Sequence, residues 1–175
     1  MSFEFTVSDV IPASPQAIYK AWLDANSHTA MTGGKAAQCS AEPGSTFTAW
    51  DGYITGRNLE IEPYWRIVQS WRTTKFTAAD PDSRIEVVLE PVPGGTRVSV
   101  HHSNVPDAHT SYRDGGWQRS YFEPMKLYFA GALTPAKRAA RKSAKKKFAS
   151  KAKKTKRRTK KRPKKRTKRN KKKKG

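Results

Sequence analysis

Apolar and polar residues alternate at the start of the chain. Phe3, Phe5 and Val7 are separated by polar residues, the period-two pattern of a half-buried strand. Ser14 is then suited to cap a helix whose first position is Pro15. The apolar spacing becomes helical at positions 17, 18, 21 and 22. The pattern predicts a strand and a short helix, followed by an irregular segment through His28 and Met31 to the glycines at 33 and 34.

From Thr46 onward the period of the pattern changes back to two. Turn-forming residues interrupt it, among them Asp51-Gly52, Asp80-Pro81 and Gly94-Gly95. Short strands joined by tight turns are typical of an antiparallel meander. We therefore expect five strands, at residues 46–50, 52–61, 65–74, 83–90 and 96–103.

Helical spacing returns near the end of the patterned region. Trp117, Tyr121, Met125 and Tyr128 recur at intervals of four and three, which predicts a long helix with an apolar face. Pro124 lies inside this helix and lacks the N–H that would bond the carbonyl four residues earlier, so we expect a kink there. The order of elements predicts an α+β domain in which this helix packs on a curved sheet.

Charge divides the chain into two parts. All 14 acidic residues lie between Glu4 and Glu123, whereas residues 134–175 hold 25 of the 36 Lys and Arg and no acid. All five Trp and all six Tyr lie in residues 1–133, and the basic segment has a single aromatic residue, Phe148. We therefore expect a globular domain at 1–133 and a disordered Lys/Arg-rich tail at 134–175, which has too little to bury to offset its ordering entropy.

Several protein classes are disfavoured by what the sequence contains. The first residues show no signal-peptide pattern, and no run approaches the roughly 18 apolar residues of a membrane span. The single cysteine, Cys39, excludes an internal disulfide and has no neighbouring base that would activate it. We expect a soluble cytoplasmic protein, associated with the nucleoid in a bacterial host or with the nucleus in a eukaryotic one.

Five segments, taken in order, resemble a known family. They read SPQAIY, WDGYITG, RIVQSWR, GTR and GWQRSYF, at residues 14–19, 50–56, 66–72, 95–97 and 116–122. Together they are similar to the C-terminal-domain family of activators of the heat-shock chaperone of ninety kilodaltons. That family belongs to the START-like, helix-grip (SRPBCC) superfamily. The resemblance covers about residues 3–130 and does not include the tail.

The resemblance implies a helix-grip fold, with a six-stranded antiparallel sheet wrapped on a long C-terminal helix and an apolar cavity between them. Members include chaperone cofactors, small-molecule carriers and some polyketide cyclases, so the fold does not fix the function. The full-length activator docks on its chaperone through a separate N-terminal domain that this sequence does not contain. A heat-shock chaperone is therefore an alternative partner.

Nine large side chains are candidates for lining the cavity. In a helix-grip arrangement they converge between helix and sheet, where an aromatic-lined, mostly apolar site would suit a small hydrophobic ligand. The same side chains are also compatible with an ordinary filled core, and the sequence leaves both interpretations open. They are Trp22, Met31, Phe47, Tyr53, Trp71, Trp117, Tyr121, Met125 and Tyr128.

Metal binding and catalysis find little support in the sequence. His101 and His102 are adjacent on a strand and point to opposite faces, so they do not share an ion easily. The candidate acids, at positions 51, 86, 90 and 123, come with no nucleophile or pKa-tuning partner. Arg72 is a candidate for holding a ligand carboxylate, or simply an exposed strand-end arginine. We expect no cofactor, no metal and no catalytic residue, and a cyclase-like enzyme is the third interpretation.

The basic tail predicts sequence-independent binding to DNA or RNA. Each neutralised phosphate releases condensed counterions, and nothing in the tail can read base edges. Alternatives are a solubilising tail, an anionic membrane surface, or a nuclear address at residues 156–166. The residues expected to contact phosphates are Lys137, Arg138, Arg141, Lys142, Lys145, Lys146, Lys147, Lys156, Arg157, Arg158, Lys160, Lys161, Arg162, Lys164, Lys165 and Arg166.

The two parts together suggest a function. The leading hypothesis is a non-enzymatic helix-grip domain that binds a small apolar ligand or a protein partner, with a tail that places it on nucleic acid. The alternative is a co-chaperone module in which the tail has no role.

Overall fold

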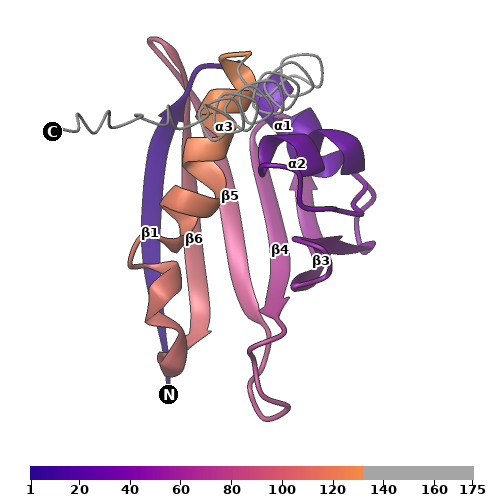
Figure 1. Ribbon diagram of the computed structural model, residues 1–175, viewed down its shortest axis with the longest axis vertical. Coiled ribbons are helices and arrows are strands. Elements are labelled where there is room, and N and C mark those ends of the chain that lie inside the picture. The colour runs from indigo at the N-terminus through magenta and orange to yellow at the C-terminus, as the bar shows by residue number, and fades with distance from the viewer. Residues whose placement is uncertain (132–175) are drawn as a thin grey trace, which may run out of the picture. The chain divides into compact units, whose positions relative to one another are not determined.

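The computed structural model describes residues 1–131 (Figure 1). The predicted basic segment, with its expected disorder and its phosphate-contacting residues, lies outside them. No helix in the described range is both long enough and apolar enough to cross a bilayer. The elements are β1 (Ser2–Ile11), α1 (Pro15–Leu23), α2 (Ala25–Met31), β2 (Thr46–Ala49), β3 (Ile54–Glu62), β4 (Arg66–Thr73), β5 (Ser83–Val92), β6 (Gly95–Pro106), η1 (Asp107–Tyr112), η2 (Gln118–Phe122) and α3 (Glu123–Phe129).

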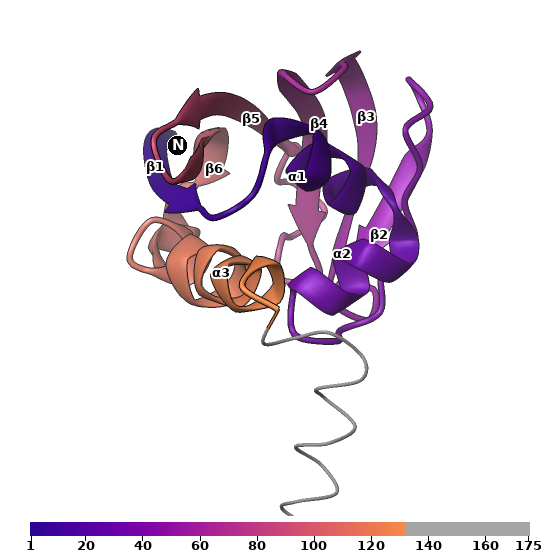
Figure 2. The ribbon, with the colours of Figure 1, turned by 90° about the horizontal axis from the view of Figure 1, so that it is seen from above.

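The strands form one six-stranded antiparallel sheet in the order β1-β6-β5-β4-β3-β2. Consecutive strands from β2 to β6 are neighbours, as a meander requires, and β1 joins the far side of β6. Seen from above, the sheet curves, and α1, α2 and α3 all lie on its concave side (Figure 2). The predicted α+β helix-grip fold is confirmed.

Strand β1 follows from the alternation that opens the sequence. Its inward-facing residues, Phe3, Phe5 and Val7, are half-buried and its other face is exposed. The strand ends at Ile11, which is fully buried. Its pairing with β6 shifts register between Phe3 and Phe5, so a bulge lies near its start.

Helix α1 begins as the sequence predicts. The Ser14 hydroxyl accepts a hydrogen bond from the Ala17 N–H at 3.2 Å, and Pro15 occupies the first helical position. Such a cap satisfies one of the backbone donors that a helix start leaves without a partner. The face that turns inward carries Ile18 and Trp22, which are both buried.

The prediction of an irregular segment after α1 is wrong, because residues 25–31 form helix α2. The Asp24 carboxylate accepts from the Ser27 N–H at 2.8 Å and caps this helix. The side chains of His28 and Met31 are buried against the core. A seven-residue helix with little intrinsic propensity is stabilised mainly by such tertiary packing, which the local sequence pattern does not report.

The last helix contains an irregularity near Pro124, but it is a widened turn. Residues of η2 form a π turn, and the Glu123 N–H donates to the Gln118 carbonyl five residues earlier. The wider turn accommodates a proline that cannot bond the carbonyl four residues back. The structure thus has a π turn directly before the proline, and a kink of the helix axis stays a prediction.

A buried polar chain crosses the core beside α1. The Trp22 indole N–H donates to Gln69 Oε1 at 3.1 Å, and Gln69 Nε2 donates to Asn58 Oδ1 at 2.7 Å. Asn58 Nδ2 in turn donates to the carbonyls of Ser40 and Glu42. Since every member is hydrogen-bonded, this chain ties the 40–45 loop to the sheet without leaving a buried amide unpaired.

Candidate ligand pocket

A pocket of about 200 Å³ opens between the first turns of the last helix, η1 and strands β3 and β4. Six aromatic side chains form most of its wall: Trp50, Tyr53, Trp71, Tyr112, Trp117 and Tyr121. Its remaining lining residues are Ile54, Ser111, Gly116, Arg119 and Ser120. The pocket is therefore mostly apolar, with a few polar groups at its edge.

Four of the nine predicted cavity residues, Tyr53, Trp71, Trp117 and Tyr121, lie around this pocket. The other five do not line it. Four of these are buried in the packed core and one is partly buried against it: Trp22, Met31, Phe47, Met125 and Tyr128. Thus the structure divides the predicted set into a wall and a supporting core, and occupancy by a ligand stays a prediction.

The aromatic wall is held in place by contacts between rings. The ring centroids of Trp117 and Tyr121 are 4.8 Å apart, and Trp71 meets Tyr112 edge-on at 5.0 Å. On its core side Tyr121 stacks on Trp22 at 5.4 Å. Offset and edge-to-face geometries of this kind are favourable beyond simple burial. The wall is therefore preformed by packing that continues into the core.

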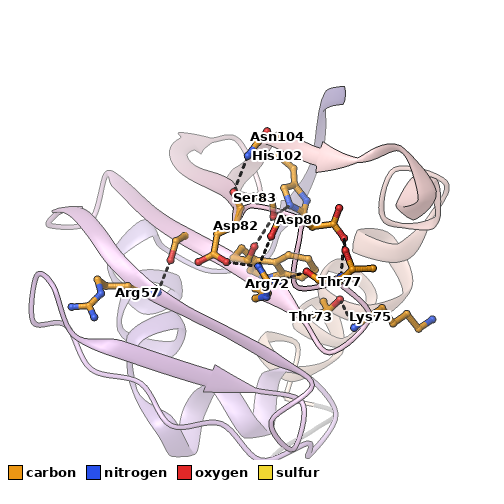
Figure 3. A network of polar contacts seen from close by, with 12 residues as sticks. Arg57, Arg72, Thr73, Lys75, Thr77, Asp80, Asp82, Ser83, His102 and Asn104 are labelled. Carbon is orange, nitrogen blue, oxygen red and sulfur yellow. Dashed lines mark hydrogen bonds and ion pairs between the residues drawn. The ribbon is translucent and has the colours of Figure 1, made fainter. Parts of the chain in front are cut away.

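Beneath this wall lies a buried histidine, His102, whose side chain is fully inaccessible to solvent. The Trp117 indole N–H donates to His102 Nδ1 at 3.3 Å, so this ring nitrogen is an acceptor. The other nitrogen, Nε2, then carries the proton and donates to Ser83 Oγ at 2.9 Å. The Ser83 hydroxyl donates onward to the backbone carbonyl of Trp71 at 2.7 Å, so the chain connects the Trp117 indole to the backbone of β4 (Figure 3).

Burial also fixes the charge state of His102. Desolvation, with a smaller contribution from the charge of His101, lowers the pKa of His102 to about 3. A protonated ring would also lose its acceptor nitrogen and leave the Trp117 N–H without a partner. His102 is therefore a neutral structural support of the pocket at physiological pH.

Hydroxyl groups provide the polar edge next to β3 and β4. The Tyr112 hydroxyl forms a hydrogen bond with Thr73 Oγ1 at 2.8 Å and a longer one with the Tyr53 hydroxyl at 3.4 Å. Burial raises the pKa of Tyr112 well above its ordinary value, although the Thr73 hydroxyl opposes this shift. The Tyr112 phenol therefore offers a neutral hydrogen-bonding group to the pocket.

Trp50 reaches the pocket through a strained turn that the sequence analysis did not connect to it. Trp50 and Asp51 have φ of 58° and 57°, in the left-handed region that bulky residues rarely adopt. The turn is held because Asp51 Oδ1 accepts from the Ala36 N–H at 2.8 Å and the Asp51 N–H donates to the Ala36 carbonyl. Strain of this kind persists only where the surroundings enforce it.

Among residues 1–131, Arg119 is the only charged one that lines the pocket, and the sequence pattern did not select it. Helical spacing places position 119 on the face opposite Trp117 and Tyr121. Its long side chain nevertheless lies against Gly115, where a Cβ would approach Arg119 Nη1 to 2.5 Å. The glycines at 115 and 116, directly before the helix, are the sequence feature that could have pointed to it.

Arg72, which the sequence offered as a ligand-carboxylate group, is engaged within the protein (Figure 3). Its guanidinium donates to Asp82 Oδ1 at 2.9 Å and to the carbonyls of Asp80 and Thr77. It also lies over the ring of Phe76. Arg72 therefore anchors the loop between β4 and β5 through three of its five N–H donors.

The histidines behave as the strand geometry predicts. His102 faces the core, while His101 lies on the other face beside Thr6 and Glu4. His109 stacks on Phe76 with ring centroids 5.0 Å apart. No group of three or more metal-ligating side chains occurs among residues 1–131.

The acidic residues considered for catalysis do not line the pocket. Glu86 accepts from Arg66 Nε, and this hydrogen bond holds the pKa of Glu86 below its usual range despite partial burial. Glu90 pairs with Arg97 at 3.7 Å, and Asp51 pairs with Lys35 at 3.5 Å. Of the described residues that line the pocket, none is a carboxylate. The arrangement provides groups for binding, with no positioned carboxylic acid for proton transfer.

A curved antiparallel sheet that grips a C-terminal helix, with an aromatic pocket between them, defines a helix-grip protein of the START-like class. The sequence profile of the family described as "Activator of Hsp90 ATPase homolog 1-like protein" matches residues 12–130. The chain belongs to this family.

Relatives and solved structures agree with this assignment. The mouse "Activator of 90 kDa heat shock protein ATPase homolog 1" is 25% identical over 126 residues, which cover 72% of this chain and 37% of the relative. The mouse homolog 2 is 28% identical over 86 residues, which cover 49% of this chain and 26% of the relative. The chain thus spans well under half the length of these curated relatives.

Two solved structures share the fold. An HSP90 activator from Plasmodium falciparum superposes with a TM-score of 0.65 at 20% identity, covering 73% of this chain and 96% of that one. CalU16 from Micromonospora echinospora superposes with a TM-score of 0.62 at 18% identity, covering 85% and 88%. At these identities the likeness concerns the fold alone.

Proposed function

We propose that residues 1–133 form a ligand-binding helix-grip module that takes a small aromatic compound into the pocket beside Trp71 and Trp117. The observation that carries this proposal is the preformed aromatic pocket of about 200 Å³. An apolar cavity of about 150 Å³ accepts benzene, and drug-sized ligands need roughly 300 Å³ or more. The pocket volume therefore suits a compound with one ring and a short substituent.

The proposal can be tested with phenylacetamide, a neutral one-ring probe. Binding should shift the NMR signals of the indole N–H groups of Trp71 and Trp117. Ser120→Phe adds a ring at the pocket edge and should abolish these shifts. Ser8→Phe adds the same ring on the exposed face of β1 and should leave them unchanged. A folded protein that shows no shifts, or equal shifts in both variants, would contradict a ligand-accessible pocket.

For the tail, residues 134–175, we propose sequence-independent binding to DNA or RNA. It contains 25 Lys and Arg and no acid. If about ten of these neutralise phosphates of duplex DNA, log affinity should fall against log salt with a slope of roughly −9. Such binding would place the protein on the nucleoid in a bacterium or in the nucleus of a eukaryote.

Deletion of residues 134–175 tests this second activity. The deletion should remove DNA binding at physiological salt, a scrambled tail should retain it, and a tail with Lys and Arg replaced by Gln should lose it. Retention of binding by residues 1–133 alone would overturn the assignment to the tail.

A co-chaperone role is the alternative, and family membership is the observation that favours it. In this case the body would bind a heat-shock chaperone and the tail would be dispensable. Pull-downs with and without nuclease, from the intact and the tail-less protein, separate the two. A chaperone retained by the tail-less body after nuclease treatment favours the alternative, and partners lost on nuclease treatment favour the nucleic-acid role.

A further inference from the structure

The guanidinium of Arg119 borders the aromatic pocket, where it lies over the backbone of Gly115. Gly115, over which it lies, has φ of +92° and no side chain, and an added Cβ would approach Arg119 Nη1 to 2.5 Å. The absence of a side chain at this glycine therefore lets a long, exposed arginine lie against the backbone at the pocket edge.

No carboxylate between residues 1 and 131 forms an ion pair with Arg119. The acid next in sequence to Gly115, Asp114, accepts from Arg113 Nε at 2.9 Å. Arg66, by contrast, pairs with Glu60, Glu62 and Glu86 at once. The Arg119 donors are therefore available to a ligand.

Other basic residues among 1–131 also lack a carboxylate partner, but Arg119 differs from them because it lines the pocket. Lys20 and Lys75 are also exposed, but neither lines the pocket. Arg119 shares the pocket with Trp117 and Tyr121, and with the hydroxyls of Ser111 and Ser120. Since no described lining residue is acidic, nothing in the wall repels an anion.

We propose that this pocket selects aromatic monocarboxylates, with the ring against Trp71, Trp117 and Tyr121 and the carboxylate held in a two-point contact by Arg119. The planar guanidinium matches a carboxylate with two parallel hydrogen bonds. The inference rests on the proposed ligand-binding function and adds the class of ligand. The volume of about 200 Å³ limits the ligand to a single ring with a short acidic substituent.

The test compares phenylacetate with its neutral analogue phenylacetamide on the full-length protein, by titration of the Trp indole N–H signals. Phenylacetate should bind about 10-fold more tightly, because a charge-assisted hydrogen bond to arginine is stronger than a neutral one. Arg119→Gln should remove that preference, because it should weaken the binding of phenylacetate much more than that of phenylacetamide. Arg119→Lys should retain part of it, and the preference should shrink as salt rises.

Lys20→Gln is the matched control, since it removes one exposed positive charge from α1 at a distance from the lining. It should leave both affinities unchanged. If Lys20→Gln reduces phenylacetate binding as much as Arg119→Gln does, the effect is general charge and the proposal is wrong.

The remaining outcomes separate this inference from the function on which it rests. Equal binding of both probes to the wild type overturns the anion preference and leaves the pocket as a ligand site. Binding of neither probe overturns both. If the Arg119→Gln variant still prefers phenylacetate over phenylacetamide, another group holds the carboxylate and the proposed role of Arg119 is wrong.

Discussion

At the scale of single residues, His102 determines how the pocket wall responds to acid. Its ring is neutral in the folded protein because burial lowers its pKa to about 3 from the ordinary 6.5. The unfolded chain therefore binds a proton that the folded chain does not, between about pH 6.5 and pH 3. The pKa of buried His28 is lowered as well, again by burial. Both histidines thus favour unfolding as the pH falls.

Stability should accordingly decrease on mild acidification. We expect His102 alone to contribute a loss of about 2 kcal/mol between pH 6.5 and pH 5, from about 1.4 kcal/mol per pH unit. Urea unfolding at pH 7 and pH 5 measures this loss of the free energy of unfolding. His102→Gln should be less stable at pH 7, and its pH dependence should be smaller by about one proton.

His101→Gln is the control: His101 lies on the opposite face of the same strand, and this variant should keep most of the pH dependence because burial is the larger cause of the lowered pKa of His102. An unchanged slope in His102→Gln would contradict a neutral buried ring. If that variant does not fold, NMR titration of the wild-type His102 ring should still show no protonation down to about pH 4.

At the scale of elements, helix α2 depends on its cap. The Asp24 side chain accepts from the Ser27 N–H at 2.8 Å, and hydrogen bonds from the Ser27 side chain and then from its N–H hold the pKa of Asp24 below its ordinary value. Asp24→Ala should lower the free energy of unfolding by about 1 kcal/mol, while Asp24→Asn should cost only a few tenths. Chemical denaturation measures both changes.

Glu42→Ala removes an exposed acid that caps no helix, and it should be nearly neutral. Equal losses in Asp24→Ala and Glu42→Ala would mean that net charge, and not the cap, explains the effect.

At the scale of the whole molecule, the last helix is attached to the first strand by Asp9. Its carboxylate accepts from Lys126 Nζ at 2.6 Å and from Gln118 Nε2 at 2.8 Å. Burial alone would raise the pKa of Asp9, but these donors and the Val10 N–H together hold it below 3.8. The stabilisation is therefore present above about pH 3.8 and is lost as pH falls through the lower folded pKa.

A double-mutant cycle with Asp9→Ala and Lys126→Ala measures this attachment. We expect a coupling free energy of about 0.5 to 1 kcal/mol between Asp9 and Lys126. Partial exposure of the pair keeps this energy small, but the contact joins two elements that are far apart in sequence. The exposed pair of Arg113 and Asp114, adjacent in sequence, should show almost none. Equal couplings in both pairs would contradict a special role of Asp9 in docking the helix.

Much of the fold was predictable because local patterns carry it. Alternation identified the strands, and Ser14-Pro15 identified the start of α1. Helix α2 was missed because its stability comes from the cap at Asp24 and from buried His28 and Met31, and not from a regular apolar period. The π turn was anticipated only as an irregularity at Pro124.

The sequence by itself determined which residues are inside: eight of the nine predicted cavity residues are buried or line the pocket, and the ninth, Tyr128, packs partly buried against the core. Only the tertiary structure decided which of them face an opening. It also brought in Trp50 through a strained turn, Tyr112 from η1, and Arg119 across Gly115. The physical reason is that the spacing of apolar residues along one helix or strand indicates only the face on which a side chain lies. Whether that face meets another side chain or a gap depends on how several elements pack together.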